Sequence, residues 1–124
     1  MQKLPELARL FELIAKDTPS VVVEIGTARG GVFYGLCQLA KPTAKVVSID
    51  LPGGNFGGGY HESEVKGFST YAKPGQRLSF LRLDSHDAST VGKLRKSLGA
   101  SSIDLLFIDG DHTYEGVKRD YEMY

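Results

Sequence analysis

The chain has 124 residues, and its 15 Lys and Arg balance its 15 Asp and Glu to give a formal charge of zero. This balance predicts no nucleic-acid partner, and no apolar run approaches the length of a membrane-spanning helix. The single cysteine, Cys37, excludes an intrachain disulfide framework and favours a reducing compartment. We therefore expect one domain over residues 1–124, located in the cytoplasm, with Cys37 in its core.

The first part of the chain predicts a helix, a strand and a second helix. Apolar residues recur at helical spacing over residues 4–16, which predicts an amphipathic helix. The β-branched run over residues 21–25 is typical of a strand buried on both faces of a parallel sheet. A glycine-rich turn over residues 26–31 follows, and a helix over residues 32–40 ends before Pro42.

The rest of the chain repeats this alternation. We predict strands over residues 45–50, 78–83 and 103–108, a helix over 62–71, a helix from a cap at Asp87 to Leu98, and a last helix after a cap at Thr113. Tyr114, Val117, Tyr121 and Tyr124 fall on one side of that last helix, which we expect to be its packing face. The alternation predicts an α/β fold, a Rossmann-like parallel sheet with flanking helices.

An unusual polar group follows each predicted strand. These groups are residues 24–31, Asp50, residues 84–87 and residues 109–112. Ligands of parallel α/β sheets lie beyond the carboxyl ends of the strands. The sequence therefore predicts one shared site at this edge of the sheet.

The turn after the first strand indicates the charge of the ligand. It lacks the G-x-G-x-x-G spacing of a dinucleotide site, because Ala28 stands where the second glycine would be. Glu24 would repel a pyrophosphate and attract a cation, such as S-adenosylmethionine (SAM) with its sulfonium and ammonium groups. Asp50 can accept hydrogen bonds from both ribose hydroxyls, a feature that NAD and SAM sites share. A NAD-type site, and a paired structural role for Glu24, are the alternatives.

Two segments resemble those of known enzymes. Glu24-Ile-Gly26-Thr-Ala-Arg-Gly30 resembles the first motif of class I SAM-dependent methyltransferases. The segment IDGDHTYEGV, residues 108–117, is similar to the macrocin O-methyltransferase and cephalosporin-hydroxylase-like group of small-molecule O-methyltransferases, and more distantly to the catechol type. The resemblance covers nearly the whole chain. It implies a sheet order of 3-2-1-4, SAM as cofactor and a small-molecule acceptor.

The resemblance also implies roles for single residues. The methionine part of SAM would be held by Glu24, Gly26, Thr27, Ala28 and Gly30, the ribose by Asp50 and the adenine by Ser85 and His86, with Asp109 beside the cofactor. Asp109 matches the Mg²⁺ ligand of metal-dependent relatives, and His112 falls where the catechol type carries its lysine base. The alternative for His86 is an ordinary exposed loop position.

Two carboxylates and an imidazole lie within the four residues from Asp109 to His112. Such a group can bind a divalent cation, or it can orient and deprotonate an acceptor hydroxyl. His112 and Asp111 are the catalytic candidates, and the resemblance implies Asp109 as the candidate Mg²⁺ ligand. The alternative for Asp111 and His112 is helix capping and loop hydrogen bonding.

The glycine-rich segment over residues 53–60 lacks the Gly-Lys-Ser/Thr ending of a P-loop. It is interpreted either as a lid over the site or as a surface loop.

The chain ends in the helix after the fourth strand, so we expect the front part of a methyltransferase fold, truncated before most of the acceptor pocket. The fourth strand would then be a bare apolar edge, which predicts a homodimer. The alternative function is a catalytically inactive SAM-binding module that acts as a dimer or as a partner subunit.

Overall fold

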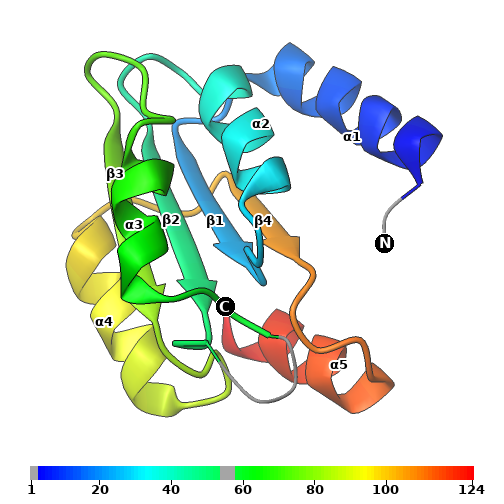
Figure 1. Ribbon diagram of the computed structural model, residues 1–124, viewed down its shortest axis with the longest axis vertical. Coiled ribbons are helices and arrows are strands. Elements are labelled where there is room, and N and C mark those ends of the chain that lie inside the picture. The colour runs from blue at the N-terminus through cyan, green and yellow to red at the C-terminus, as the bar shows by residue number, and fades with distance from the viewer. Residues whose placement is uncertain (1–2, 54–57) are drawn as a thin grey trace.

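Four apolar runs of the sequence form a parallel sheet in the computed structural model, which describes residues 3–53 and 58–124. The strands are β1 (Val21–Ile25), β2 (Lys45–Asp50), β3 (Arg77–Arg82) and β4 (Leu105–Ile108), in the order β3-β2-β1-β4 (Figure 1). β1 is central, because Val23 pairs with Val47 of β2 and with Leu106 of β4. The predicted order is confirmed, and β1 is buried along its whole length, as expected for a strand covered on both faces.

Helices cover both faces of this sheet. In the described residues they are α1 (Leu4–Asp17), α2 (Gly31–Leu39), α3 (Glu62–Ser69), α4 (Ala88–Leu98) and α5 (Tyr114–Met123). The predicted caps are confirmed: Asp87 accepts the N–H of Ser89 at 2.8 Å, and Thr113 accepts the N–H of Gly116 at 3.0 Å. Within the described chain, no helix has the length and apolar character needed to cross a membrane.

The fourth strand begins later than predicted. β4 starts at Leu105 and not at Ile103, because Asp104 serves a different purpose. Its carboxylate accepts the N–H groups of Ser20 at 2.8 Å and of Val21 at 3.0 Å. This side chain satisfies the donors that precede β1, so the regular ladder begins one residue after it.

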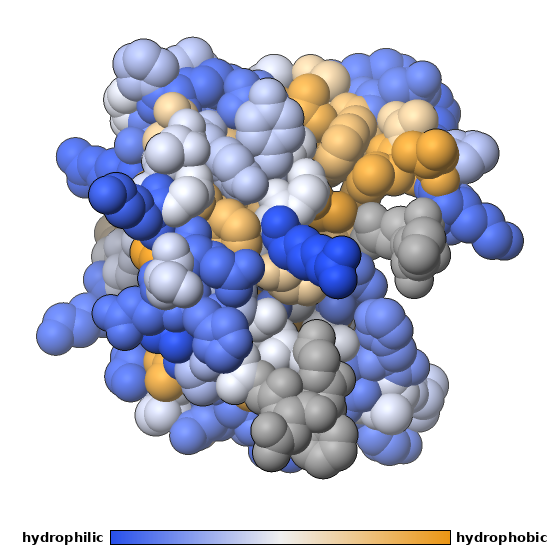
Figure 2. Space-filling model, viewed as in Figure 1, coloured by the Kyte–Doolittle hydropathy of each residue, from blue (hydrophilic) through white to orange (hydrophobic). Residues whose placement is uncertain are grey.

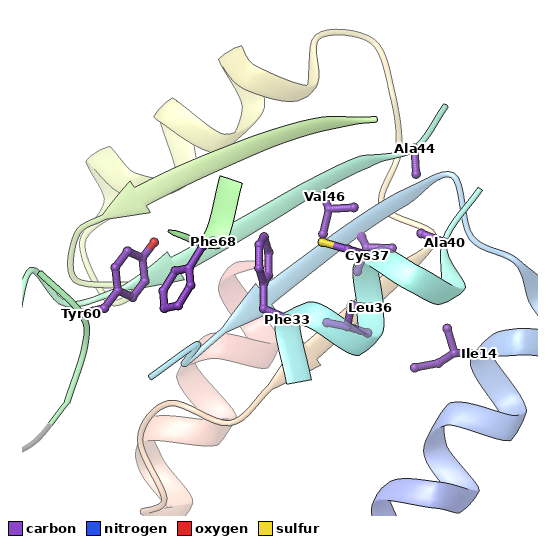
Figure 3. Close-up of a cluster of buried hydrophobic side chains, with 10 residues drawn as sticks. Ile14, Phe33, Leu36, Cys37, Ala40, Ala44, Val46, Tyr60 and Phe68 are labelled. Atoms are coloured by element: carbon purple, nitrogen blue, oxygen red, sulfur yellow. The ribbon is translucent and has the colours of Figure 1, made fainter. Parts of the chain in front are cut away.

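One core cluster lies between the sheet and α1, α2 and α3 (Figure 3). Phe33, Leu36 and Cys37 of α2 are fully buried in it. Figure 3 shows the Cys37 sulfur beside Val46 of β2. The predicted core position of Cys37 is confirmed, and burial raises the pKa of its thiol to about 12.

The predicted packing face of the last helix is confirmed at Tyr124, which packs against a core cluster, and is wrong for its other three residues. Tyr114 and Tyr121 are 77% and 75% exposed, and Val117 is 42% exposed. α5 instead buries Gly116 and Asp120. Carboxylates are seldom buried, so the pattern of apolar residues did not predict that Asp120 lies on the inward side of the helix.

The contact between α1 and α2 generates a stability prediction. A Cβ added at Gly35 of α2 would overlap the Phe11 ring of α1. Gly35→Ala should therefore lower the free energy of unfolding by about 1–3 kcal/mol through overpacking. In the matched control Gly67→Ala, in α3, the added Cβ meets no atom within 4 Å, and the change should add about 0.5–1 kcal/mol. Urea unfolding followed by circular dichroism measures both, and equal effects would contradict this packing.

Candidate functional site

The carboxyl ends of all four strands open onto one cleft of about 640 Å³. Eight of the residues predicted from the sequence line it: Gly26, Ala28, Asp50, Ser85, His86, Asp109, Asp111 and His112. The other lining residues are Ile25, Ile49, Leu51, Gly58, Gly59, Leu83, Asp84 and Gly110. Three predicted residues, Glu24, Thr27 and Gly30, are buried and lie outside the lining.

The turn after β1 passes very close to the end of β4. Gly26 has a φ of 91°, and a Cβ there would overlap the backbone carbonyl of Asp109, so this position requires glycine. The Gly26 N–H donates to the carbonyl of Ile49 in β2 at 2.9 Å. Ala28 has a left-handed φ of 47°, a strained conformation for a residue with a side chain. The turn therefore joins β1, β2 and β4 at the mouth of the cleft.

Asp50 is held in place by backbone donors. Its Oδ2 accepts the N–H of Ala28 at 2.7 Å, and its Oδ1 accepts the N–H of Leu51 at 2.8 Å. These bonds orient the carboxylate and tie the end of β2 to the turn after β1. Each carboxylate oxygen has a further lone pair, so Asp50 can still accept from two neighbouring hydroxyl groups.

Glu24 lies beneath the turn at the start of a buried hydrogen-bond chain. Its Oε2 accepts from the Thr27 hydroxyl at 2.7 Å, which lies 2.7 Å from the Ser48 hydroxyl. Ser48 in turn lies 2.9 Å from the hydroxyl of Tyr60, which is 1% exposed. In the described part of the chain, the other oxygen, Oε1, has no hydrogen-bond partner.

This burial changes the expected charge of Glu24. Desolvation raises the pKa of its carboxyl to about 8; the Thr27 hydrogen bond opposes that shift, and the charges of Asp50 and Asp109 add to it. At neutral pH the buried group is therefore mainly uncharged. The sequence predicts a carboxylate at Glu24 that attracts a cation; Glu24 is buried, and the carboxylates that line the cleft are those of Asp50, Asp84, Asp109 and Asp111.

The segment after β4 brings together the predicted catalytic residues. His112 Nε2 lies 3.3 Å from Asp109 Oδ1, with side chains 74% and 37% exposed. Asp111 accepts the N–H of Thr113 at 2.8 Å, which lowers the pKa of its exposed carboxyl. Asp111 therefore supports the start of α5, while Asp109 and His112 face the cleft as a pair.

The glycine-rich segment is anchored at both ends by one side chain. Arg82 of β3 donates to the carbonyls of Pro52 and Tyr60, each at 3.2 Å. Gly58 and Gly59 line the cleft. The predicted lid or surface loop includes residues 54–57, which lie outside the described residues.

Two residues of the hydrogen-bond chain, Ser48 and Tyr60, were missed by sequence reasoning. A usable signal was present for Ser48, because a polar residue inside the apolar run of β2 needs a buried partner. No local signal was present for Tyr60, which follows a run of glycines and is buried only through its contacts in the folded chain.

Glu24→Gln should remove a pH dependence of stability. Because the pKa is about 8 in the folded chain and 4.5 for a fully solvated glutamate side chain, the folded chain keeps a proton that the unfolded chain has lost between these values. The free energy of unfolding should therefore fall as pH rises through this range, by at least about 1 kcal/mol. Urea unfolding at pH 5.5 and pH 7.5 measures the fall.

The control for this experiment is Glu12→Gln on the exposed surface of α1, which should keep the wild-type pH dependence. A Glu24→Gln chain whose stability falls as steeply as that of the wild type would contradict the burial of an ionisable group at this position.

Comparison with known proteins agrees with this fold. The model of a family described as a methyltransferase domain matches residues 23–124. Uncharacterized protein y4gI of Sinorhizobium fredii (strain NBRC 101917 / NGR234) is 29% identical over 107 residues, which are 84% of this chain and 11% of that protein.

A solved structure extends the likeness to three dimensions. It is the O-methyltransferase TomG from Streptomyces achromogenes, involved in tomaymycin synthesis and solved in complex with SAM. Its TM-score is 0.60 and its identity 15%, over 99% of this chain and 52% of that chain. The chain thus spans about half the length of this structure, which shares its fold. Since the family match runs through all four strands and the cleft residues beyond them, the chain belongs to the methyltransferase domain family, as its resemblance to the class I enzymes predicted.

Proposed function

We propose that the chain binds SAM in the cleft and forms the cofactor-binding part of an enzyme that methylates a hydroxyl group of a small molecule. The charge of the cleft carries this proposal. Asp50, Asp84, Asp109 and Asp111 line it, and no Lys or Arg is among its described lining residues. Such a cleft attracts a sulfonium and an ammonium group and repels a pyrophosphate. SAM therefore fits it better than a NAD-type dinucleotide does.

Each part of SAM has a counterpart in the lining. Asp50 accepts hydrogen bonds from the ribose hydroxyls, and the backbone around Gly26 and Ala28 receives the methionine part. The adenine lies against Ser85 and His86, with Leu51 and Leu83 supplying apolar surface. The cleft volume of about 640 Å³ is in the usual range for a small-molecule site. TomG, which has the same fold, was solved in complex with SAM, and this supports SAM as the ligand.

Methyl transfer then needs an acceptor oxygen in line with the bond between sulfur and the methyl carbon. The oxygen attacks that carbon, the carbon–sulfur bond breaks and S-adenosylhomocysteine (SAH) leaves as a neutral thioether. His112 takes the hydroxyl proton. Asp109, 3.3 Å from His112 Nε2, orients the ring and stabilises it when protonated. Positioning of the two reactants supplies much of the rate.

Asp109 is the only residue proposed as a ligand of Mg²⁺. Across residues 3–53 and 58–124, no three His, Cys, Asp or Glu side chains are gathered where they could hold a metal ion. Mg²⁺ commonly binds through one or two carboxylates and keeps several waters, so Asp109 is the one protein ligand that is proposed for it. No step of the proposed reaction involves a metal.

One observation favours a second candidate, a SAM-binding module that does not transfer the methyl group. The His112 side chain is 74% exposed and Asp109 is 37% exposed. Methyl transfer to a hydroxyl benefits from a site that excludes water, and the described residues leave this pair open. Cofactor binding without turnover would identify the module.

We also propose the cytoplasm as the location of the chain, because its one cysteine is the buried, unpaired Cys37. The formal charge of zero gives no reason to add a nucleic-acid partner.

The proposal predicts tight and selective binding in the cleft. Calorimetry should show SAM and SAH binding to the chain, and Asp50→Ala should weaken both by about 10- to 100-fold through loss of charge-assisted hydrogen bonds. Glu12→Gln, an exposed change on α1, should leave binding unaltered. The SAM titration is repeated in the presence of Mg²⁺, and again with NADH as a competitor of SAM. Displacement of SAM by NADH, or no binding of SAM and SAH, would sink the proposal.

A second prediction concerns a homodimer through the β4 edge. In the described sheet β4 pairs with β1 alone, and its residues are only half-buried. A second cleft of about 570 Å³ lies nearby, lined by Leu10, Leu13 and Leu105 among others. Figure 2 shows hydrophobic residues gathered over α1. Pairing of the β4 edges of two chains would cover these apolar residues. Light scattering should give twice the mass of one chain at micromolar concentration, and a single-chain mass would refute the dimer.

A further inference from the structure

Helix α5 reaches across the cleft to the loop that follows β3, although β3 and β4 lie at opposite edges of the sheet. Arg119 donates to the His86 carbonyl at 2.9 Å, and the Tyr124 hydroxyl donates to the Ser85 carbonyl at 2.7 Å. Figure 1 shows α5 at the carboxyl end of the sheet. The helix that follows the last strand therefore holds the backbone of a loop on the other side of the cleft.

The same helix also holds the ring of His86. Nε2 lies 3.2 Å from the Gly116 carbonyl oxygen and 3.3 Å from Asp120 Oδ1. A carbonyl oxygen and a carboxylate oxygen only accept hydrogen bonds, so the proton of the neutral ring belongs on Nε2. Nδ1 is then the nitrogen with a free lone pair.

Asp120 is an unusual residue in this position. It is fully buried, and within the described chain neither of its carboxylate oxygens has a hydrogen-bond partner. Its contact with His86 has the distance of an ion pair without the alignment of a hydrogen bond. A buried carboxylate without hydrogen bonds costs stability. An apolar side chain would pack there at lower cost, so the carboxylate calls for a role that concerns the group it faces.

We propose that Asp120 is a positioning residue that keeps the His86 proton on Nε2, so that Nδ1 accepts a hydrogen bond from the amino group of the adenine. The inference rests on the proposed SAM site. His86 lines the cleft and its side chain is 21% exposed, so a ligand can reach the ring. An acceptor nitrogen matches a 6-amino purine and opposes a 6-oxo purine, which presents a second acceptor.

The tautomer is measured without any ligand. The chain has three histidines, so the ¹⁵N shifts of their rings can be assigned with single substitutions. The shifts are followed through a pH titration so that the neutral ring is observed, and in that form the proton of the wild-type His86 should lie on Nε2. A neutral ring with its proton on Nδ1 overturns the proposal.

The variant Asp120→Asn tests the carboxylate itself. An amide can turn its NH₂ group toward Nε2, which favours a proton on Nδ1. We expect a measurable population of that second tautomer. Glu122→Gln is the matched control, because it removes an exposed carboxylate of α5 that pairs with Lys118 and not with His86. Circular dichroism and urea unfolding establish that each variant folds.

Binding then tests the consequence for the ligand. The wild type should bind SAH about tenfold or more tightly than its deaminated analogue, S-inosylhomocysteine. The analogue loses the hydrogen bond to Nδ1 and leaves two acceptors facing each other. Asp120→Asn should reduce this preference several-fold, His86→Leu should abolish it and Glu122→Gln should keep it. A folded Asp120→Asn chain with the wild-type tautomer and preference makes Asp120 merely structural and overturns the proposal. If the wild type binds neither ligand, both the proposed SAM site and the adenine role of His86 are wrong. The ¹⁵N shifts of the His86 ring decide separately whether Asp120 controls the tautomer.

Discussion

The site depends on one close approach, between the backbone of Gly26 and the backbone of Asp109. No side chain fits between them, so the turn after β1 meets the end of β4 directly. The same turn bonds to β2 through the Gly26 N–H, and it orients Asp50 through the N–H of Ala28. Three strand ends therefore share one point, and the polar residues beyond them face a single cleft. A bulkier residue at this turn would separate the strands and divide the site.

The acidic groups of the site fall into two kinds with different chemistry. The aspartates of the lining are in contact with solvent and give the cleft its negative charge. Glu24 is enclosed beneath the turn, and burial raises the pKa of its carboxyl to about 8. A cation bound above the turn favours the ionised form of such a group and lowers this pKa. In the proposed SAM site the lining carboxylates would attract the cation first, and the buried carboxyl would then respond to its charge.

Local sequence patterns predicted the sheet and most of the cleft residues. The β-branched runs, the glycine turn and the cap residues depend on neighbours in the chain, so the strands and the helix starts were confirmed. The order of the sheet, also confirmed, was implied by the resemblance to class I methyltransferases and not by local patterns. The errors lie where distant segments decide the outcome. The start of β4 depends on Asp104 and its bonds to Ser20 and Val21. The inward side of α5 places Gly116 and Asp120 against His86, from a loop some thirty residues earlier, while Tyr114 and Tyr121 of the helix are exposed.

The double contact of Arg82 has a consequence for how this site can diverge among related sequences. One guanidinium holds the carbonyls of Pro52 and Tyr60, so the two ends of the intervening segment are fixed whatever lies between them. Doubling the length of a closed loop adds only about 0.6 kcal/mol of entropic cost. Insertions between these anchors can therefore accumulate at little expense to the fold, whereas Gly59 must stay glycine, because its φ is 83° and a Cβ there would overlap the Leu51 carbonyl. Because Gly58 and Gly59 line the cleft, such changes would alter the rim of the site while β3 and the cofactor-facing strand ends stay in place.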